Sequence, residues 1–250
     1  MSALTNKICW ITGAGTGIGA AAARSLAAAG AHVVLSGRRS EPLANLAKEI
    51  HNQTGSASIQ ILDVTDQQRV AETAKEILAA HGRIDILVNS AGINIPKRSW
   101  NDVSPEGWDS VVDADLNGAF YCCHAVLPAM REQQDGLIIN VSSWAGVRPS
   151  KLTGPAYNAA KHGLVAMNES LNIEEGQNGI RATALCPGEV ATPILDNRPI
   201  PPSQEERDRM LQPEDLGDTV LYVAMLPKRA CVNTLVISPT WNRSYISNSL

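Results

Sequence analysis

The sequence predicts an α/β domain built on a parallel sheet with helices against both of its faces. Short apolar runs rich in β-branched residues alternate with longer helical patterns from end to end, as they do in βαβ units. Several central runs are apolar at every position, as strands covered on both sides must be. A glycine-rich turn follows the first run directly and leads into an alanine-rich helical stretch.

The expected strands follow from these runs in chain order. They cover residues 7–12, 32–36, 58–62, 84–89, 137–142, 181–186 and 233–238. Helical patterns lie between them, such as 20–30 and 43–50, and the proline-rich, then charged segment 198–210 predicts a loop followed by a short exposed helix. No stretch resembles a linker. We therefore expect one domain over 1–250, with a substrate lid at about 190–212 and a C-terminal tail at about 239–250.

Composition excludes several classes of function. The 250 residues are 44% apolar, enough for one large core, and the formal charge of -4 provides no footprint for nucleic acid. No apolar run approaches the roughly 18 residues of a membrane span, and no targeting segment precedes the first strand. We expect no metal site and a cytoplasmic protein with reduced cysteines, because no C-x-x-C pair occurs among Cys9, Cys122, Cys123, Cys186 and Cys231.

The glycine-rich turn carries the first functional signal. Gly13, Gly15, Gly17 and Gly19 lie between a strand that ends at Thr12 and a helix. Glycines let the backbone turn sharply and approach a pyrophosphate, while the helix N-terminus offers unpaired N–H groups. No Lys-Ser or Lys-Thr follows the last glycine, which disfavours a P-loop that hydrolyses nucleoside triphosphates. The turn therefore predicts a dinucleotide cofactor.

A tyrosine and a lysine carry the second signal. Tyr157 and Lys161 are four residues apart, which on a helix places their Cβ atoms about 6 Å from each other on one face. An ammonium group nearby favours the phenolate of a tyrosine, whose free pKa is about 10. Such pairs also occur by chance on amphipathic helices. Ser143, at the end of the fifth expected strand, can donate to a carbonyl oxygen held beside the tyrosine.

Six motifs in order give the chain its resemblance to a known family. They are Thr12-Gly13 with Gly17 and Gly19, Asp63-Val64, the run NSAG at 89–92, Ser143, the Tyr157/Lys161 pair and the run PGEVAT at 187–192. This arrangement resembles the short-chain dehydrogenase/reductase family, in its branch of about 250 residues. The resemblance implies a doubly wound Rossmann-type fold with seven parallel strands, and hydride transfer to or from a nicotinamide cofactor.

The resemblance also implies roles for individual residues. Ser143 would hold the substrate oxygen, Tyr157 would act as general acid/base, and Lys161 would lower the tyrosine pKa and bind the nicotinamide ribose. Pro187 to Thr192 would hold the carboxamide and direct transfer of the pro-S hydride. The expected cofactor-binding residues are Gly13, Gly15, Thr16, Gly17, Ile18, Gly19, Arg38, Arg39, Asp63, Val64, Asn89, Ala91, Gly92, Tyr157, Lys161, Pro187, Gly188, Val190 and Thr192.

The chain departs from the family pattern at two site positions. Asp115 stands where the family has an asparagine that acts largely through its backbone carbonyl, which aspartate preserves. Its carboxylate can stabilise the ammonium of Lys161, compete for it, bind the water of a proton relay, or simply be solvated or cap the helix. We count Asp115 among the candidate catalytic residues. Ser90 replaces the second asparagine of the commoner N-N-A-G.

The end of the second strand bears on the choice of cofactor. Members selective for NAD usually carry an aspartate where this chain has Gly37, and Arg38 and Arg39 follow it. Guanidinium groups pair with phosphate, so we favour NADP(H) over NAD(H). The alternative is that one or both arginines stack on the adenine or face water.

The expected activity is that of an NAD(P)-dependent oxidoreductase interconverting a secondary alcohol and a ketone, or an aldehyde and an alcohol, of small to medium size. Alternatives are a decarboxylating dehydrogenase, an epimerase, or a catalytically silent NAD(P)-binding sensor or partner-binding module. Arg148 or Arg198 can recognise an anionic group, and Trp144 can line the pocket or pack in the core. By resemblance we expect a homo-oligomer, a dimer or tetramer, with no membrane partner.

Overall fold

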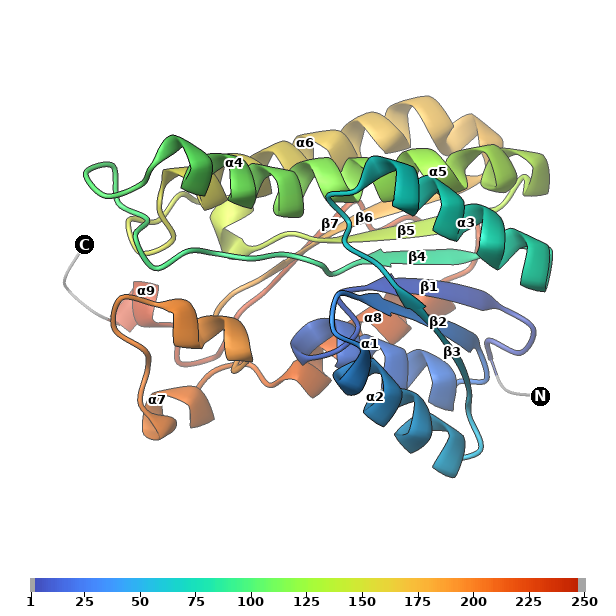
Figure 1. Ribbon diagram of the computed structural model, residues 1–250, viewed down its shortest axis with the longest axis horizontal. Helices are drawn as coiled ribbons and strands as arrows, with labels where there is room; N and C mark the ends of the chain where they lie inside the picture. The colour runs from blue at the N-terminus through green and yellow to red at the C-terminus, as the bar shows by residue number, and fades with distance from the viewer. Residues whose placement is uncertain (1–2, 247–250) are drawn as a thin grey trace.

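A computed structural model describes residues 3–246 and contains a seven-stranded parallel sheet (Figure 1). The strands are β1 (Ile8–Thr12), β2 (His32–Gly37), β3 (Ser56–Ile61), β4 (Ile86–Asn89), β5 (Gly136–Val141), β6 (Ile180–Pro187) and β7 (Thr234–Ile237). All seven expected strands are confirmed, with boundaries shifted by a residue or two. Their order is β3-β2-β1-β4-β5-β6-β7, so the chain changes direction across the sheet between β1 and β4. Ligands of such folds bind outside the carboxyl ends of the strands at this switch point.

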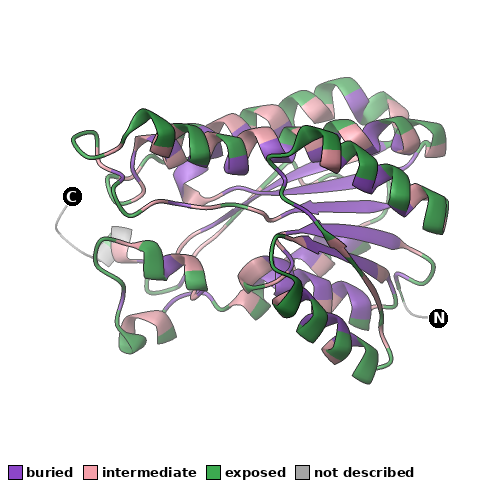
Figure 2. Ribbon diagram, in the orientation of Figure 1, coloured by how far each residue is buried: buried purple, intermediate pink, exposed green. Residues whose placement is uncertain are grey.

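Helices cover both faces of the sheet (Figure 1). One layer contains α1 (Gly17–Ala28), α2 (Ser40–Asn52) and α8 (Pro213–Met225), and the other contains α3 (Gln67–His81), α5 (Gly118–Gln133) and α6 (Pro155–Glu175). Alternate residues of one strand supply the two cores: Cys9 and Ile11 pack with the first layer, and Ile8 and Trp10 with the second. Figure 2 shows the resulting pattern of buried strands and helices exposed on their outer sides.

Shorter elements gather at the carboxyl ends of the strands (Figure 1). They are α4 (Pro105–Val112), the π-helical turn η1 (Asp113–Asn117), the 3₁₀ turns η2 (Trp144–Gly146) and η4 (Pro193–Asn197), α7 (Gln204–Asp208) and α9 (Arg243–Ile246). A further 3₁₀ turn, η3 (Gly176–Asn178), follows α6. The expected short helix after the proline-rich loop is α7, which begins with a capping box between Ser203 and Glu206.

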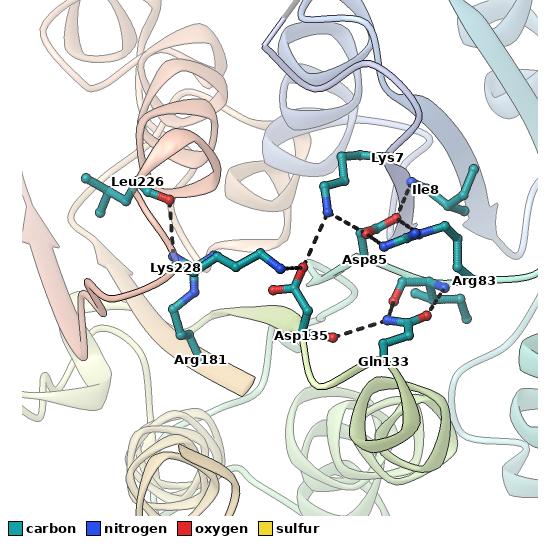
Figure 3. A network of polar contacts seen from close by, with 10 residues as sticks. Lys7, Ile8, Arg83, Asp85, Gln133, Asp135, Arg181, Leu226 and Lys228 are labelled. Carbon is teal, nitrogen blue, oxygen red and sulfur yellow. Dashed lines mark hydrogen bonds and ion pairs between the residues drawn. The ribbon is translucent and has the colours of Figure 1, made fainter. Parts of the chain in front are cut away.

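Ion pairs tie the strands together at the opposite, amino-terminal end of the sheet (Figure 3). The buried carboxylate of Asp85, just before β4, accepts hydrogen bonds from Lys7 Nζ at 2.7 Å, Ile8 N at 2.9 Å and Arg83 Nε at 2.8 Å. Lys7 also lies 3.4 Å from Asp135, which precedes β5. One carboxylate thus joins the starts of β1 and β4, and Lys7 extends the network to β5.

The described part of the C-terminal tail packs against other segments of the same chain. The guanidinium of Arg209 is 4.8 Å from the ring centre of Trp241, and the ring of Tyr245 meets that of Trp144 edge-on at 5.6 Å. Arg243 pairs with Glu189 at 3.2 Å and with Glu206 at 3.0 Å. The tail up to Tyr245 therefore holds the segment expected as the lid, while residues 247–250 of the expected tail lie outside the described residues.

Three further expectations concern the cysteines, metal ligands and membrane-spanning helices. All five cysteines are free thiols, four of them buried and Cys231 exposed. Within residues 3–246, no group of three or more potential metal-ligating side chains occurs. No helix in that same range is long and apolar enough to cross a membrane.

Candidate active site

The site forms where η2 packs against the first turns of α6. Helix α6 follows Gly154, whose φ of 78° suits glycine, and begins with Pro155 at a position that needs no N–H donor. A Cβ atom on Gly146 would overlap Ser142 Oγ and the carbonyl oxygen of Lys161, so only glycine permits this approach. Ser142 Oγ donates to that carbonyl at 2.9 Å. The turn after β5 is thereby fixed against the helix that carries Tyr157 and Lys161.

Ser143 and Tyr157 face each other across this contact. Ser143 Oγ accepts a hydrogen bond from Ala145 N at 3.1 Å, which leaves its own hydrogen free to be donated. A hydrogen bond with Ser143 lowers the pKa of Tyr157, so the serine favours the phenolate. The buried neighbour Ser142 serves the backbone, which supports Ser143 as the serine of the reaction centre.

Lys161 is buried, and its ammonium has three neighbours. Nζ donates to the carbonyl oxygen of Val141 at 3.1 Å, lies 3.2 Å from Asp115 Oδ2, and is 5.5 Å from the ring centre of Tyr157. An ammonium has three donors, so a further one can serve a ribose hydroxyl. The spacing expected from sequence thus brings Tyr157 and Lys161 onto one face, with Asp115 beside them.

Asp115 links the loop after β4 to this lysine. It is 1% exposed, and its Oδ1 accepts from Ile93 N at 2.7 Å while Oδ2 faces Lys161. Of the alternatives from sequence, the solvated aspartate is wrong and the ion pair with Lys161 is observed. Asn117, two residues on, instead donates to Asp113 Oδ1 at 2.8 Å, away from the buried pair.

The electrostatics of the centre differ from the sequence expectation in one respect. Burial raises the pKa of Tyr157; Lys161 lowers it, Asp115 raises it, and the net pKa lies above the usual value. Burial alone would lower the pKa of Lys161, but the charges of Asp115 and Tyr157 raise it overall. The expected influence of Lys161 on Tyr157 is present, yet burial and Asp115 outweigh it, so the phenol is protonated at neutral pH.

The glycine turn fits a pyrophosphate closely. Gly13 and Gly17 have positive φ angles of 65° and 57°, and a Cβ on Gly13 would come within 2.6 Å of Ser90 O. A Cβ on Gly19 would overlap Gly13 O. The turn opens α1, whose exposed N-cap Thr16 makes no side-chain capping bond. Backbone N–H groups, the helix dipole and the lack of side chains together suit a phosphate-bearing group.

Two arginines stand beside the turn. Arg38 and Arg39, directly after β2, are both exposed, and within the described chain neither has a carboxylate partner at ion-pair distance. Gly37 precedes them with space around it, since a Cβ there would meet only Leu43 side-chain atoms at 3.8 Å. Both guanidinium groups are therefore available to a phosphate.

The remaining expected cofactor residues fall into two groups. Gly15, Ile18, Ala91 and Gly188 are partly exposed and Asp63 and Gly92 are exposed, whereas Val64, Pro187, Val190 and Thr192 are buried. Asp63 Oδ1 accepts from Thr65 N at 3.1 Å, and Val64 packs where a Cβ on Gly118 would clash. A Cβ on Gly17 would lie 3.0 Å from Thr192 Cγ2, so the segment 187–192 reaches over the glycine turn.

Asn89 also makes contacts inside the fold. Its side chain is buried and points into the sheet, where Nδ2 donates to Asn140 Oδ1 at 2.9 Å. Asn140 in turn donates to Asn168 at 3.1 Å, and Asn168 donates to the carbonyl oxygen of Asn233 at 3.1 Å. The Asn89 side chain thus belongs to an amide chain that joins β4, β5, α6 and the segment before β7, which sequence reasoning missed.

Arg198, Arg148 and Trp144, the candidates for contact with the substrate, have different surroundings in the structure. Arg198 pairs with Glu189 at 2.8 Å, and exposed Arg148 lies 5.5 Å from the ring centre of Trp144. Trp144 is half-buried, between Arg148 and Tyr245. Sequence reasoning missed a third arginine, Arg98, which is buried in the loop after β4. Its only signal was its place a few residues beyond the carboxyl end of a central strand.

Comparisons with known proteins agree with this geometry. The family model described as short chain dehydrogenase matches residues 7–201. An uncharacterized oxidoreductase of Staphylococcus aureus (strain USA300) is 35% identical over 242 residues, which cover 96% of this chain and all of the relative. A metagenomic short-chain oxidoreductase in complex with NADP has a TM-score of 0.84 at 32% identity, covering 96% of this chain and 99% of the other.

Two further solved structures are similar over most of their length. Levodione reductase has a TM-score of 0.87 at 28% identity, covering 94% of this chain and 97% of its own. The closed form of serine dehydrogenase complexed with NADP+ has a TM-score of 0.83 at 31% identity, covering 93% and 94%. With its sheet order, glycine turn and matched length, the chain belongs to the short-chain dehydrogenase/reductase family, whose members are NAD(P)-binding oxidoreductases.

Proposed function

We propose that the protein interconverts a secondary alcohol and a ketone, or an aldehyde and an alcohol, with NADP(H) as the preferred cofactor. The observation that carries the proposal is the placement of Tyr157 between Ser143 and Lys161 at the carboxyl end of β5. The nicotinamide, when bound, supplies or accepts the hydride. The residues of the chain then have to move only a proton.

The proton chemistry follows from the contacts of the three side chains. In the direction of reduction, Ser143 donates to the substrate oxygen and Tyr157 gives its proton to the alkoxide that develops there. The raised pKa of Tyr157 keeps that proton available at neutral pH. Lys161 stabilises the resulting phenolate, and Asp115 holds Lys161 charged.

The preference for NADP(H) is supported by the end of β2. Arg38 and Arg39 are exposed beside the glycine turn, and no acidic residue stands at Gly37 to repel a 2′-phosphate. Two of the similar structures were solved with NADP or NADP+. The proposed cofactor surface comprises the turn 13–19, these arginines, Asp63 and Val64, Ala91 and Gly92, Tyr157 and Lys161, and 187–192.

The proposed assembly is a homo-oligomer, a dimer or tetramer. Large apolar side chains that are exposed on the outer helices and on an edge strand support it: Phe120 on α5 and Ile173 on α6 are 48% and 75% exposed. Tyr222 and Met225 on α8 and Val236 on the edge strand β7 are 58%, 55% and 49% exposed. Large apolar side chains left exposed on helices and at a sheet edge are typical of surfaces that bind another subunit.

The experiment combines the purified protein with NADPH or NADH and a panel of ketones and aldehydes, and follows cofactor absorbance in the near ultraviolet. The reverse direction uses the matching alcohols. Turnover that Tyr157→Phe reduces about 1000-fold, while NADPH binding stays saturable, is the expected result. Saturable NADPH binding with no turnover in either direction would instead support the sensor, which the unusual Asp115 and the high tyrosine pKa keep as the second candidate.

A further inference from the structure

Arg98 is an arginine in an unusual setting. It lies in the loop between β4 and α4 and is only 7% exposed, whereas arginines are almost never fully buried unless they are paired. Burial lowers its pKa, and the nearby charge of Arg198 lowers it further. The fold therefore maintains a positive charge where its solvation by water is largely lost.

The hydrogen bonds of Arg98 leave much of that charge uncompensated. Nη2 donates to the backbone carbonyl of Asn197. Nε is buried and has no hydrogen-bond partner among the described residues, and no described carboxylate lies at ion-pair distance from the guanidinium. Arg198, by contrast, is neutralised by Glu189. A buried ion without a counter-ion is costly, which makes an anion from outside the chain the natural partner.

The position of Arg98 directs this charge toward the reaction centre. Its carbonyl oxygen packs so closely on Gly154, the residue before α6, that a Cβ there would overlap it. Tyr157 follows in the first turn of that helix, and the two side chains interact electrostatically. On its other side, Arg98 contacts η4, the first element of the lid, through Asn197. The guanidinium thus lies between the catalytic helix and the lid.

We propose that Arg98 binds a carboxylate of the substrate, so that the preferred substrates are oxo acids and the corresponding hydroxy acids. A guanidinium matches the planar geometry of a carboxylate and can donate two parallel hydrogen bonds to it. The anion would occupy the unpartnered side of Arg98, beside Tyr157 and under the lid. This inference rests on the proposed function, because the carboxylate is bound in the same site as the reacting carbonyl.

The test compares oxo acids with their neutral methyl esters. With NADPH, 2-, 3- and 4-oxo acids are assayed beside their esters, and for at least one chain length we expect kcat/KM for the acid to exceed that for the ester about 100-fold. Arg98→Gln, which keeps a donor for Asn197 O but loses the charge, is expected to remove this preference by raising KM for the acid far more than KM for the ester. Arg229→Gln, at an exposed site between α8 and β7, is the matched control for one lost charge.

A binding measurement separates this inference from the proposed function. In the presence of NADPH, butyrate is expected to raise the melting temperature of the wild type and of Arg229→Gln, but not of Arg98→Gln, and butyramide is expected to raise none. Ketone turnover with equal rates for acids and esters would overturn the inference and leave the function standing. If kcat/KM for the acid and kcat/KM for the ester fell equally in Arg98→Gln, the role of the arginine would be only to hold the lid in place. If nothing is turned over, the proposed function fails, and the butyrate shift alone decides the role of Arg98.

Discussion

Asp115 adds a buried negative charge to the proposed reaction centre. Its carboxylate lies 3.2 Å from Lys161 and raises the pKa of both Lys161 and Tyr157, while burial raises its own pKa. With an asparagine at this position, no negative charge would oppose the effect of the Lys161 ammonium, which favours the phenolate of Tyr157. The aspartate therefore suits an enzyme whose tyrosine must hold a proton, as reduction requires.

Asp115→Asn is expected to retain activity within about tenfold of the wild type, because the amide can still accept from Ile93 N or from Lys161. Without the negative charge, the pKa of Tyr157 falls, so the rise of kcat/KM with pH for alcohol oxidation should move to lower pH. Lys161, Ser143 and Arg98 are all retained in this variant and still favour the phenolate. The measurement is a pH–rate profile for both proteins.

Asp113→Asn is the matched control, since Asp113 lies in the same π-helical turn but is exposed. Its profile should coincide with that of the wild type. A complete loss of activity in Asp115→Asn, or an unmoved profile, would contradict the electrostatic account given above.

The sequence was enough to expect Ser143, Tyr157 and Lys161 close together, but not to expect the direction in which the pKa of Tyr157 is shifted. Ser143, Tyr157 and Lys161 occupy positions that motif order and helix periodicity determine. Whether burial or the neighbouring ammonium dominates a tyrosine pKa depends on three-dimensional packing. The same holds for Arg98, whose burial results from contacts with Gly154 and Asn197 far along the chain.

Among the elements, the carboxyl end of β2 provides the sharpest test of cofactor choice. Gly37 has an ordinary φ angle and room for a Cβ beside Leu43. Gly37→Asp should therefore fold normally and place a carboxylate where a 2′-phosphate would bind. We expect the ratio of kcat/KM for NADPH to that for NADH to fall about 100-fold. Steady-state kinetics with both cofactors measures it.

A second variant separates the effect of the added charge from that of the added Cβ atom. Gly37→Ala adds the Cβ without the charge and is expected to keep the original preference. If kcat/KM for NADPH and kcat/KM for NADH fell equally in Gly37→Asp, the end of β2 would not contact the adenosine half of the cofactor.

The elements themselves were largely predictable, because strand runs and glycine turns are local signals. All seven strands and α7 lie where the sequence indicates. The π-helical turn η1 was not predicted, since one extra residue in a helical turn leaves no mark in apolar periodicity. The amide chain from Asn89 was also missed, because only the sheet brings its members together.

For the whole molecule, the Asp85 network contributes stability that depends on pH. Burial alone would raise the pKa of Asp85, but hydrogen bonds from Arg83 and Lys7 outweigh it and lower the pKa below 3.8. The stabilisation is therefore fully present above about pH 4 and is lost as pH falls further, through the folded-state pKa.

Asp85→Asn is expected to lower the free energy of unfolding by about 2 kcal/mol at pH 7, because Lys7 and Arg83 lose their buried acceptor. Catalytic rates should be unchanged, since the network lies at the far end of the sheet. Urea unfolding at pH 7 and at pH 3 measures the difference, which should shrink at the lower pH. A difference that is as large at pH 3 as at pH 7 would contradict the assignment.

Assembly can be tested at the same scale. Phe120→Asp places a charge on the exposed face of α5 and should shift the protein toward a smaller species. Size-exclusion chromatography with light scattering is the measurement, and Glu132→Gln, an exposed change on the same helix, is the control. A wild type that is already monomeric would refute the proposed oligomer.

The proposed catalytic residues and the ion-pair network of Asp85 lie at opposite ends of the sheet. This separation has a practical consequence for engineering. The proposed catalytic residues are on α6 near the carboxyl ends of the strands, whereas Asp85 and its cations lie at the amino-terminal end (Figures 1 and 3). Buried strands separate the two groups of charges. Sequence changes that adapt the lid to a new substrate can therefore be offset by reinforcing the amino-terminal end, with little interference between the two sets of changes.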